Sequence, residues 1–151
     1  MTIRSVLVAD DMLESSQAAL EEAVSIAKLA KAKLTLVSVI SVVSPGFGIP
    51  VPIGDSFEAL LEAAKRRLEA QKARLLAEGV PEVETVFLEG DPVEQVVEFA
   101  EKHQPDLIVV GSRGLSTAGR FFLGSVSDGI LHHVHCSVLV VKTHAPSKPP
   151  G

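Results

Sequence analysis

The feature that most constrains the fold is a series of short, continuous apolar runs that alternate with helical patterns. The runs are rich in valine, of which the chain has 21, against 6 aromatic residues, all of them phenylalanine. Unbroken runs of β-branched side chains are typical of parallel strands that are buried on both faces of a sheet. These runs occur at residues 6–9, 34–40, 83–88, 107–110 and 138–141. They predict a five-stranded parallel sheet.

Helical patterns fill the intervals between these runs. We expect helices at residues 16–30, 55–79, 91–104 and about 125–133, with Ser16 as the N-cap of the first. Strands that alternate with helices favour a doubly wound α/β fold with helices on both faces of the sheet, because crossover connections are right-handed.

Composition and charge limit the classes of function. The chain has 151 residues and a net charge of -5 at pH 7, so it lacks the basic surface of a general nucleic-acid or anionic-membrane binder. We expect one domain at residues 1–142 and a disordered, proline-containing tail at residues 143–151. A single cysteine, Cys136, excludes an internal disulfide and fits a reducing compartment.

Residues 34–54 carry no charge and are long enough to cross a bilayer as a helix. Pro45, Pro50 and Pro52 make such a helix impossible, so we interpret the segment as a strand followed by an apolar loop. The N-terminus also lacks the pattern of a signal peptide, and we expect a cytoplasmic protein without a membrane segment.

A glycine-rich segment after the fourth apolar run carries the residues best suited to hold a ligand. Gly111-Ser112-Arg113-Gly114 is followed, nine residues later, by Gly124-Ser125 at the start of a helix. Glycines let backbone N–H groups approach phosphate oxygens, and a helix N-terminus attracts anions. We interpret the segment as a phosphate site; glycines that merely shape a surface loop are the alternative.

This segment resembles the nucleotide-binding signature of the universal stress protein family. The spacing Gly111-x2-Gly114-x9-Gly124-Ser125, just before a helix and a Val-Leu-Val-Val strand, carries the resemblance. Asp11, after the first apolar run, is similar in position to the family's first aspartate, and the resemblance covers roughly residues 3–142. It implies the strand order 3-2-1-4-5. Two departures are Met12-Leu13, where the family usually has Gly-Ser, and Ser137, where it commonly has proline.

The resemblance also implies a ligand and its contacts. The ligand is ATP or another adenine nucleotide, such as AMP, ADP or cyclic AMP, which Mg²⁺ can accompany. Ala9, Asp10 and Asp11 line the adenine and ribose side, and backbone groups of Val39 read the base. The phosphates lie against Val110, Gly111, Arg113, Gly114, Gly124, Ser125, Val126 and Ser127. Members commonly pair through the last strand, which predicts a homodimer through residues 138–141, with Val138 and Val141 at its ends.

The function implied is that of a cytoplasmic sensor or regulator of the stress response. A dimeric interaction module that works without nucleotide is the alternative. A phosphoacceptor domain is a further alternative, because Asp10-Asp11 resembles the acidic pair of response-regulator receivers; its third aspartate would have to be Asp55. We assign no catalytic residue, because no general base is evident near a γ-phosphate, and expect at most slow ATP hydrolysis or autophosphorylation.

A cluster of His132, His133, His135 and Cys136 invites a metal hypothesis. Adjacent histidines point to different sides of a helix, and histidines near a helix C-terminus complement its dipole. We therefore expect these residues to end a helix and assign no metal.

Overall fold

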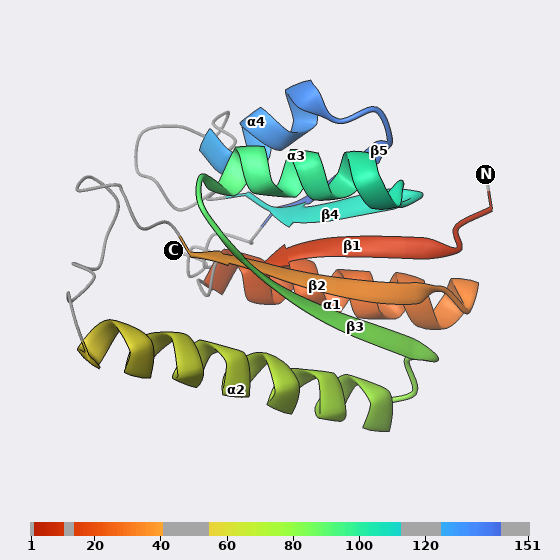
Figure 1. The fold of residues 1–151 in the computed structure, drawn as a ribbon. Helices are drawn as coiled ribbons and strands as arrows, with labels where there is room; N and C mark the ends of the chain where they lie inside the picture. Colours follow the sequence, from red (N-terminus) through yellow and green to blue (C-terminus); the bar gives the residue numbers. More distant parts are fainter. Residues whose placement is uncertain (1, 11–13, 41–54, 113–124, 143–151) are drawn as a thin grey trace, which may run out of the picture.

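A sheet of five parallel strands forms the centre of the structure (Figure 1). The computed structural model describes residues 2–10, 14–40, 55–112 and 125–142. Within them the strands are β1 (Ser5–Asp10), β2 (Lys33–Ile40), β3 (Glu82–Glu89), β4 (Leu107–Gly111) and β5 (Ser137–Val141). The helices are α1 (Glu14–Ala30), α2 (Asp55–Ala77), α3 (Pro92–His103) and α4 (Ser125–His133).

The strand order is β3-β2-β1-β4-β5, and every neighbouring pair is parallel. The predicted fold class is thereby confirmed. Receiver domains have the different order 2-1-3-4-5, and Asp55 begins α2 here and does not end a strand. The fold therefore contradicts the phosphoacceptor alternative.

The two faces of the sheet are covered by different helices. Helices α1 and α2 lie on one face, and α3 and α4 lie on the other (Figure 1). Alternate residues of β1 serve the two faces: Val6 and Val8 pack on the α1 side and Leu7 packs on the α3 side, all nearly without solvent exposure. The valine-rich runs are continuous because both of their sides are buried.

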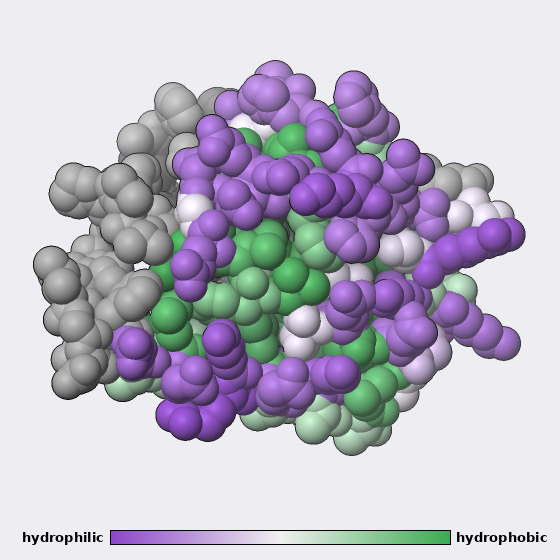
Figure 2. Space-filling view, viewed as in Figure 1, coloured by the Kyte–Doolittle hydropathy of each residue, from purple (hydrophilic) through white to green (hydrophobic). Residues whose placement is uncertain are grey.

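One part of the sheet is less completely covered. Figure 2 shows hydrophilic surface over α3 and over α2, with hydrophobic surface between them. Val86 and Leu88 of β3 belong to the apolar cluster on the α3 side and are only partly buried. Helix α3 thus protects the central strands more fully than it protects β3.

The start of α1 differs from the prediction. The helix begins at Glu14, so Ser16 lies inside its first turn and the expectation that Ser16 is the N-cap is wrong. The Ser16 hydroxyl instead donates a hydrogen bond of 2.8 Å to Oδ1 of Asp10, at the end of β1. A bond to the preceding strand competes with capping for the same side chain.

The ends of α2 and α3 follow the sequence signals. After α2, Gly79 has φ +104°, a left-handed conformation that glycine adopts without strain, and its N–H donates to the Leu76 carbonyl at 3.1 Å. Asp91 caps α3, accepting a hydrogen bond of 3.0 Å from the Glu94 N–H, and Pro92 occupies the first helical position.

In the part of the chain that the structure describes, no helix combines the length and the apolar character needed to cross a membrane.

Helices α3 and α4 pack closely because α4 contains a glycine at the contact. A Cβ atom added to Gly129 would lie 2.8 Å from Val93 Cγ2 and 2.9 Å from Val93 Cγ1. Both atoms belong to a short, β-branched side chain with little rotational freedom. The contact therefore sets how closely the two helices can approach.

We expect Gly129→Ala to destabilise the protein because the added methyl group overpacks the α3–α4 contact. Overpacking costs about 1–3 kcal/mol, offset in part by the roughly 1 kcal/mol gain in helix propensity. Urea denaturation at constant m-value measures the change. In a Val93→Ala background the same substitution should stabilise the protein; an equal destabilisation in both backgrounds would contradict the packing account.

Candidate functional site

A cavity of about 180 Å³ lies at the carboxyl ends of the central strands. Its walls come from β1, β2 and β4 and from the first turns of α3 and α4; Ser16 of α1 completes them. The connections through α1 and α2 cross one face of the sheet, and those through α3 and α4 cross the other. In this strand order the change of face falls at β1. The cavity therefore occupies the switch point, where doubly wound sheets bind ligands.

The end of the cavity next to β1 is polar. Asp10 is 7% exposed and Ser16 is 5% exposed, and the bond between their side chains joins β1 to α1. Asp10 is the one ionisable residue among the described residues that line the cavity. A buried carboxylate held by a hydroxyl donor forms this wall.

The β4 side of the cavity is held by a bond to α4. The Ser127 hydroxyl donates a short hydrogen bond of 2.5 Å to the Gly111 carbonyl. The next residue, Ser112, is 3% exposed, and its Oγ has no hydrogen-bond partner in the described structure. A buried hydroxyl without a partner costs about 1–3 kcal/mol, so this edge keeps unused hydrogen-bonding capacity.

The opposite end of the cavity is aliphatic. Val37 and Val39 are two residues apart on β2 and face the same side of the sheet, and Val96 of α3 lies across from them. Ala9 of β1 and Pro92 of α3 add two more apolar side chains to the lining. A planar, weakly polar group would find van der Waals contacts here.

Two helices begin beside the cavity, and each carries an acidic residue in its first turn. The N-terminus of α3 is neutralised by its cap, because Asp91 holds the Glu94 N–H. Helix α4 begins at Ser125, and Val126 and Ser127 from its first turn line the cavity. The first turn of α4 is therefore the better placed of the two for an anionic group.

The structure brings half of the predicted site residues together. Ala9, Asp10, Val39, Gly111, Val126 and Ser127 line the cavity. Val110 is 2% exposed and belongs to the apolar cluster beneath α3 and α4, one residue from the cavity wall. Ser125 is the first residue of α4. Asp11, Arg113, Gly114 and Gly124 lie outside the described residues.

Four lining residues were not predicted: Ser16, Val37, Pro92 and Val96. Val37 could have been found, because it shares a face of its strand with Val39. Pro92 could have been found with less certainty of position, since a helix that follows β3 must begin at the carboxyl ends of the strands. Nothing in the sequence indicated that Val96 would reach across to β2.

The two histidines that end α4 contact backbone carbonyl groups of their own helix. Nδ1 of His132 lies 2.7 Å from the Asp128 carbonyl oxygen, and Nδ1 of His133 lies 2.7 Å from the Gly129 carbonyl oxygen. Across the described ranges, no three His, Cys, Asp or Glu residues gather where they could share a metal ion.

Fold and cavity together define a doubly wound α/β domain with a cavity at the switch point of its sheet. The family model of the universal stress protein family matches residues 2–142. The chain therefore belongs to the universal stress protein family.

Individual relatives show the same likeness. A universal stress protein of Methanocaldococcus jannaschii is 36% identical over 143 residues, which are 92% of this chain and 82% of the relative. The solved universal stress protein UspA of Lactobacillus plantarum has a TM-score of 0.75 at 27% identity, covering 93% of this chain and 99% of that one. A universal stress protein solved in complex with cAMP has a TM-score of 0.70 at 29% identity, covering 95% and 100%.

We expect Ser16→Ala to lower the free energy of unfolding by about 1–3 kcal/mol, because it removes a donor from the buried carboxylate of Asp10. Urea denaturation measures this change. The matched control is Ser25→Ala, an exposed position on the same helix, where helix propensity predicts a small gain of at most about 0.7 kcal/mol. Equal effects at the two positions would show that the Asp10–Ser16 bond contributes nothing.

Proposed function

We propose that this protein binds an adenine nucleotide in the switch-point cavity and acts as a sensor or regulator in the stress response. The observation that carries the proposal is the pairing of an aliphatic end, from β2 and α3, with a polar end next to the first turn of α4. The first suits a purine base and the second suits a ribose and phosphates.

The likeness to a universal stress protein solved with cAMP supports an adenine ligand. The sequence has no tryptophan or tyrosine to stack on the base. We therefore assign base recognition to aliphatic contacts and to backbone groups near Val39. Among adenine nucleotides we propose ATP, with its phosphates beside the first turn of α4 and the glycines of residues 111–124.

A Mg²⁺ ion bound with the nucleotide fits the oxygen groups at the polar end of the switch-point cavity. Magnesium is commonly held by one or two carboxylates and by the phosphates of its substrate. Asp10 offers a carboxylate, and the Gly111 carbonyl and the hydroxyls of Ser16 and Ser127 offer further oxygens.

We do not propose efficient ATP hydrolysis. The Asp10 carboxylate already accepts a hydrogen bond from Ser16, and fast hydrolysis requires a base placed to orient an attacking water. Slow hydrolysis or autophosphorylation is the most that we propose, in a cytoplasmic protein whose nucleotide-binding domain spans residues 1–142, with residues 143–151 as a tail.

Isothermal titration of nucleotide-free protein with ATP, AMP and cAMP tests the ligand. Val126→Phe, which places a ring in the cavity, should weaken binding at least tenfold, or about 1.4 kcal/mol. Leu131→Phe is the control, because Leu131 is on the same helix, 41% exposed and outside the cavity.

Two results would count against this proposal. If none of the three nucleotides binds, the dimeric interaction module is favoured instead. If a nucleotide binds equally to the wild type and to both variants, the binding site lies elsewhere.

We further propose that the protein is a homodimer that pairs through β5. In the described structure β5 ends the sheet, and its edge carries Val138, Leu139, Val140 and Val141. The Val141 carbonyl accepts a 2.9 Å hydrogen bond from the Ser112 N–H, so the backbone groups of residue 141 face β4. Those of Val140 then face the open edge, because successive residues alternate in direction. An apolar open edge of this kind invites pairing with a second copy.

We expect Val140→Pro to convert the dimer to a folded monomer, because it removes an outward N–H and leaves the bonds to β4 in place. Light scattering coupled to size-exclusion chromatography gives the mass, and circular dichroism confirms the fold. Val140→Thr, which keeps the N–H and the β-branched shape, should remain dimeric. A dimeric Val140→Pro protein would exclude pairing through this edge.

A further inference from the structure

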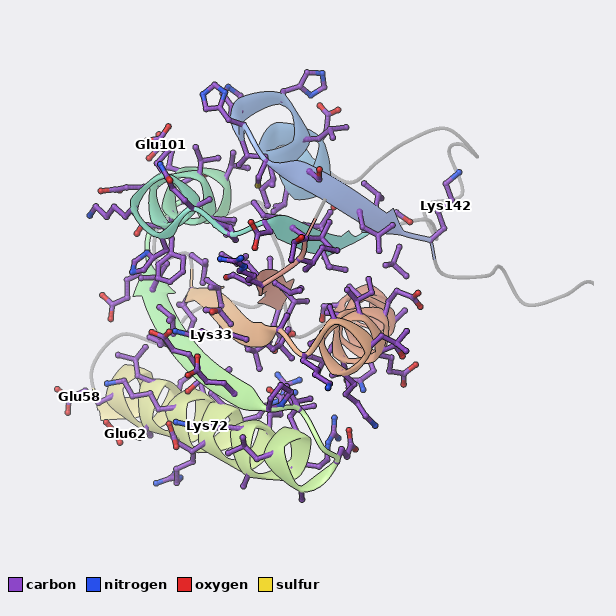
Figure 3. All side chains as sticks on the ribbon, turned by 90° about the vertical axis from the view of Figure 1, so that its right-hand side faces the viewer. Lys33, Glu58, Glu62, Lys72, Glu101 and Lys142 are labelled. Carbon is purple, nitrogen blue, oxygen red and sulfur yellow. The ribbon has the colours of Figure 1, made fainter. Side chains whose placement is uncertain are left out.

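A second cavity, of about 420 Å³, lies at the amino ends of the strands, opposite the first cavity. It is formed by the last turn of α3, by Pro105 before β4 and by residues 134–136, which connect α4 to β5. Figure 3 views the molecule from this end, with α3 and the α4–β5 segment next to each other and Glu101 labelled on α3. Its volume falls within the range of about 300–1,000 Å³ that is usual for small-molecule sites.

The cavity has an apolar interior and a polar rim. Ala100 and Pro105 are buried, and Val134 is partly buried. Glu101 and His135 are exposed at the rim. A ligand that fits must therefore combine a small apolar body with a polar group that stays near solvent.

The electrostatic environment of this cavity is negative. Helices α3 and α4 both end here, and each helix C-terminus carries the equivalent of about half a negative charge. Glu101 adds a full charge at the rim. The last turns of α3 and α4 also carry basic residues: Lys102, which is paired with Glu98 at 3.3 Å, and the histidines His103, His132 and His133.

The thiol of Cys136 belongs to the apolar interior. Burial raises the pKa of the Cys136 thiol, and the charge of Asp106 adds to the effect. The thiol is therefore neutral at pH 7 and supplies no anion of its own. The negative field comes from Glu101, Asp106 and the helix ends.

We propose that this cavity binds a small organic ammonium ion, with its carbon chain against Ala100, Pro105 and Val134 and its cationic group beside Glu101. The cavities at the two ends of the strands then prefer ligands of opposite charge. The first turns of α3 and α4 lie at the carboxyl ends of the strands, and their last turns lie at the amino ends. The proposal does not rest on nucleotide binding, and the two cavities share no lining residue.

The single cysteine of the chain allows a direct test of charge preference, because Cys136 lines the cavity. The protein is equilibrated at pH 8 with the symmetric disulfides of cysteamine (cationic), 2-mercaptoethanol (neutral) or 3-mercaptopropionate (anionic). Each exchange forms a mixed disulfide at Cys136 and releases one free thiol. Intact mass spectrometry measures the occupied fraction, and the same series on urea-unfolded protein corrects for intrinsic differences among the thiols.

After this correction we expect cysteamine to be favoured at least about threefold over 2-mercaptoethanol, with 3-mercaptopropionate the least favoured. In Glu101→Gln the preference for cysteamine should fall by half or more. Glu94→Gln removes the same charge from the first turn of α3, away from this cavity, and should leave the preference unchanged. Equal occupancy by the three thiols, or equal effects of the two variants, would overturn the proposal.

A second measurement does not use the thiol. Titration with n-butylammonium, followed by ¹⁵N–¹H correlation spectra, should shift the amide resonances of residues 100–104 and 134–136, and n-butanol should shift them less. Shifts spread over surface carboxylates in general, or equal shifts with the two compounds, would also overturn the proposal.

Discussion

The structure depends on the parallel pairing of β1 with strands on both of its sides. Because β2 and β4 occupy the two edges of β1, the connections must lie on opposite faces of the sheet on either side of it. Because crossover connections are right-handed, this pairing also determines which face of the sheet each helix covers. The same constraint buries both faces of the central strands and opens a crevice at their carboxyl ends, so the core and the candidate site have a common cause.

Much of this arrangement could be predicted from the sequence. The valine-rich runs give the strands because β-branched residues in unbroken apolar stretches have few other stable environments. Gly79 and Asp91-Pro92 mark helix ends because left-handed backbone and helix capping favour those residues. These signals depend on interactions within a few residues, which a sequence records directly.

Other features depend on tertiary contacts. Ser16 has the side chain of an N-cap, but it bonds to Asp10 once β1 and α1 are side by side. Val96 is one of several apolar residues on α3, and only the position of that helix over β2 brings it into the cavity wall. The lining residues at strand ends and at the start of α4 could be predicted from local sequence, whereas Ser16 and Val96 reach the cavity only through the packing of α1 and α3 on the sheet.

The contact between Gly129 and Val93 has a consequence for both cavities. Each cavity has α3 for one wall and α4, or the segment that leaves it, for another, and the two lie at opposite ends of this helix pair. A side chain at position 129 would hold the helices apart, whereas the bare backbone lets them touch near the first turn of α3. Because α3 and α4 pack against each other as a pair, a change in their crossing angle would change their separation at both ends, and with it the width of both cavities.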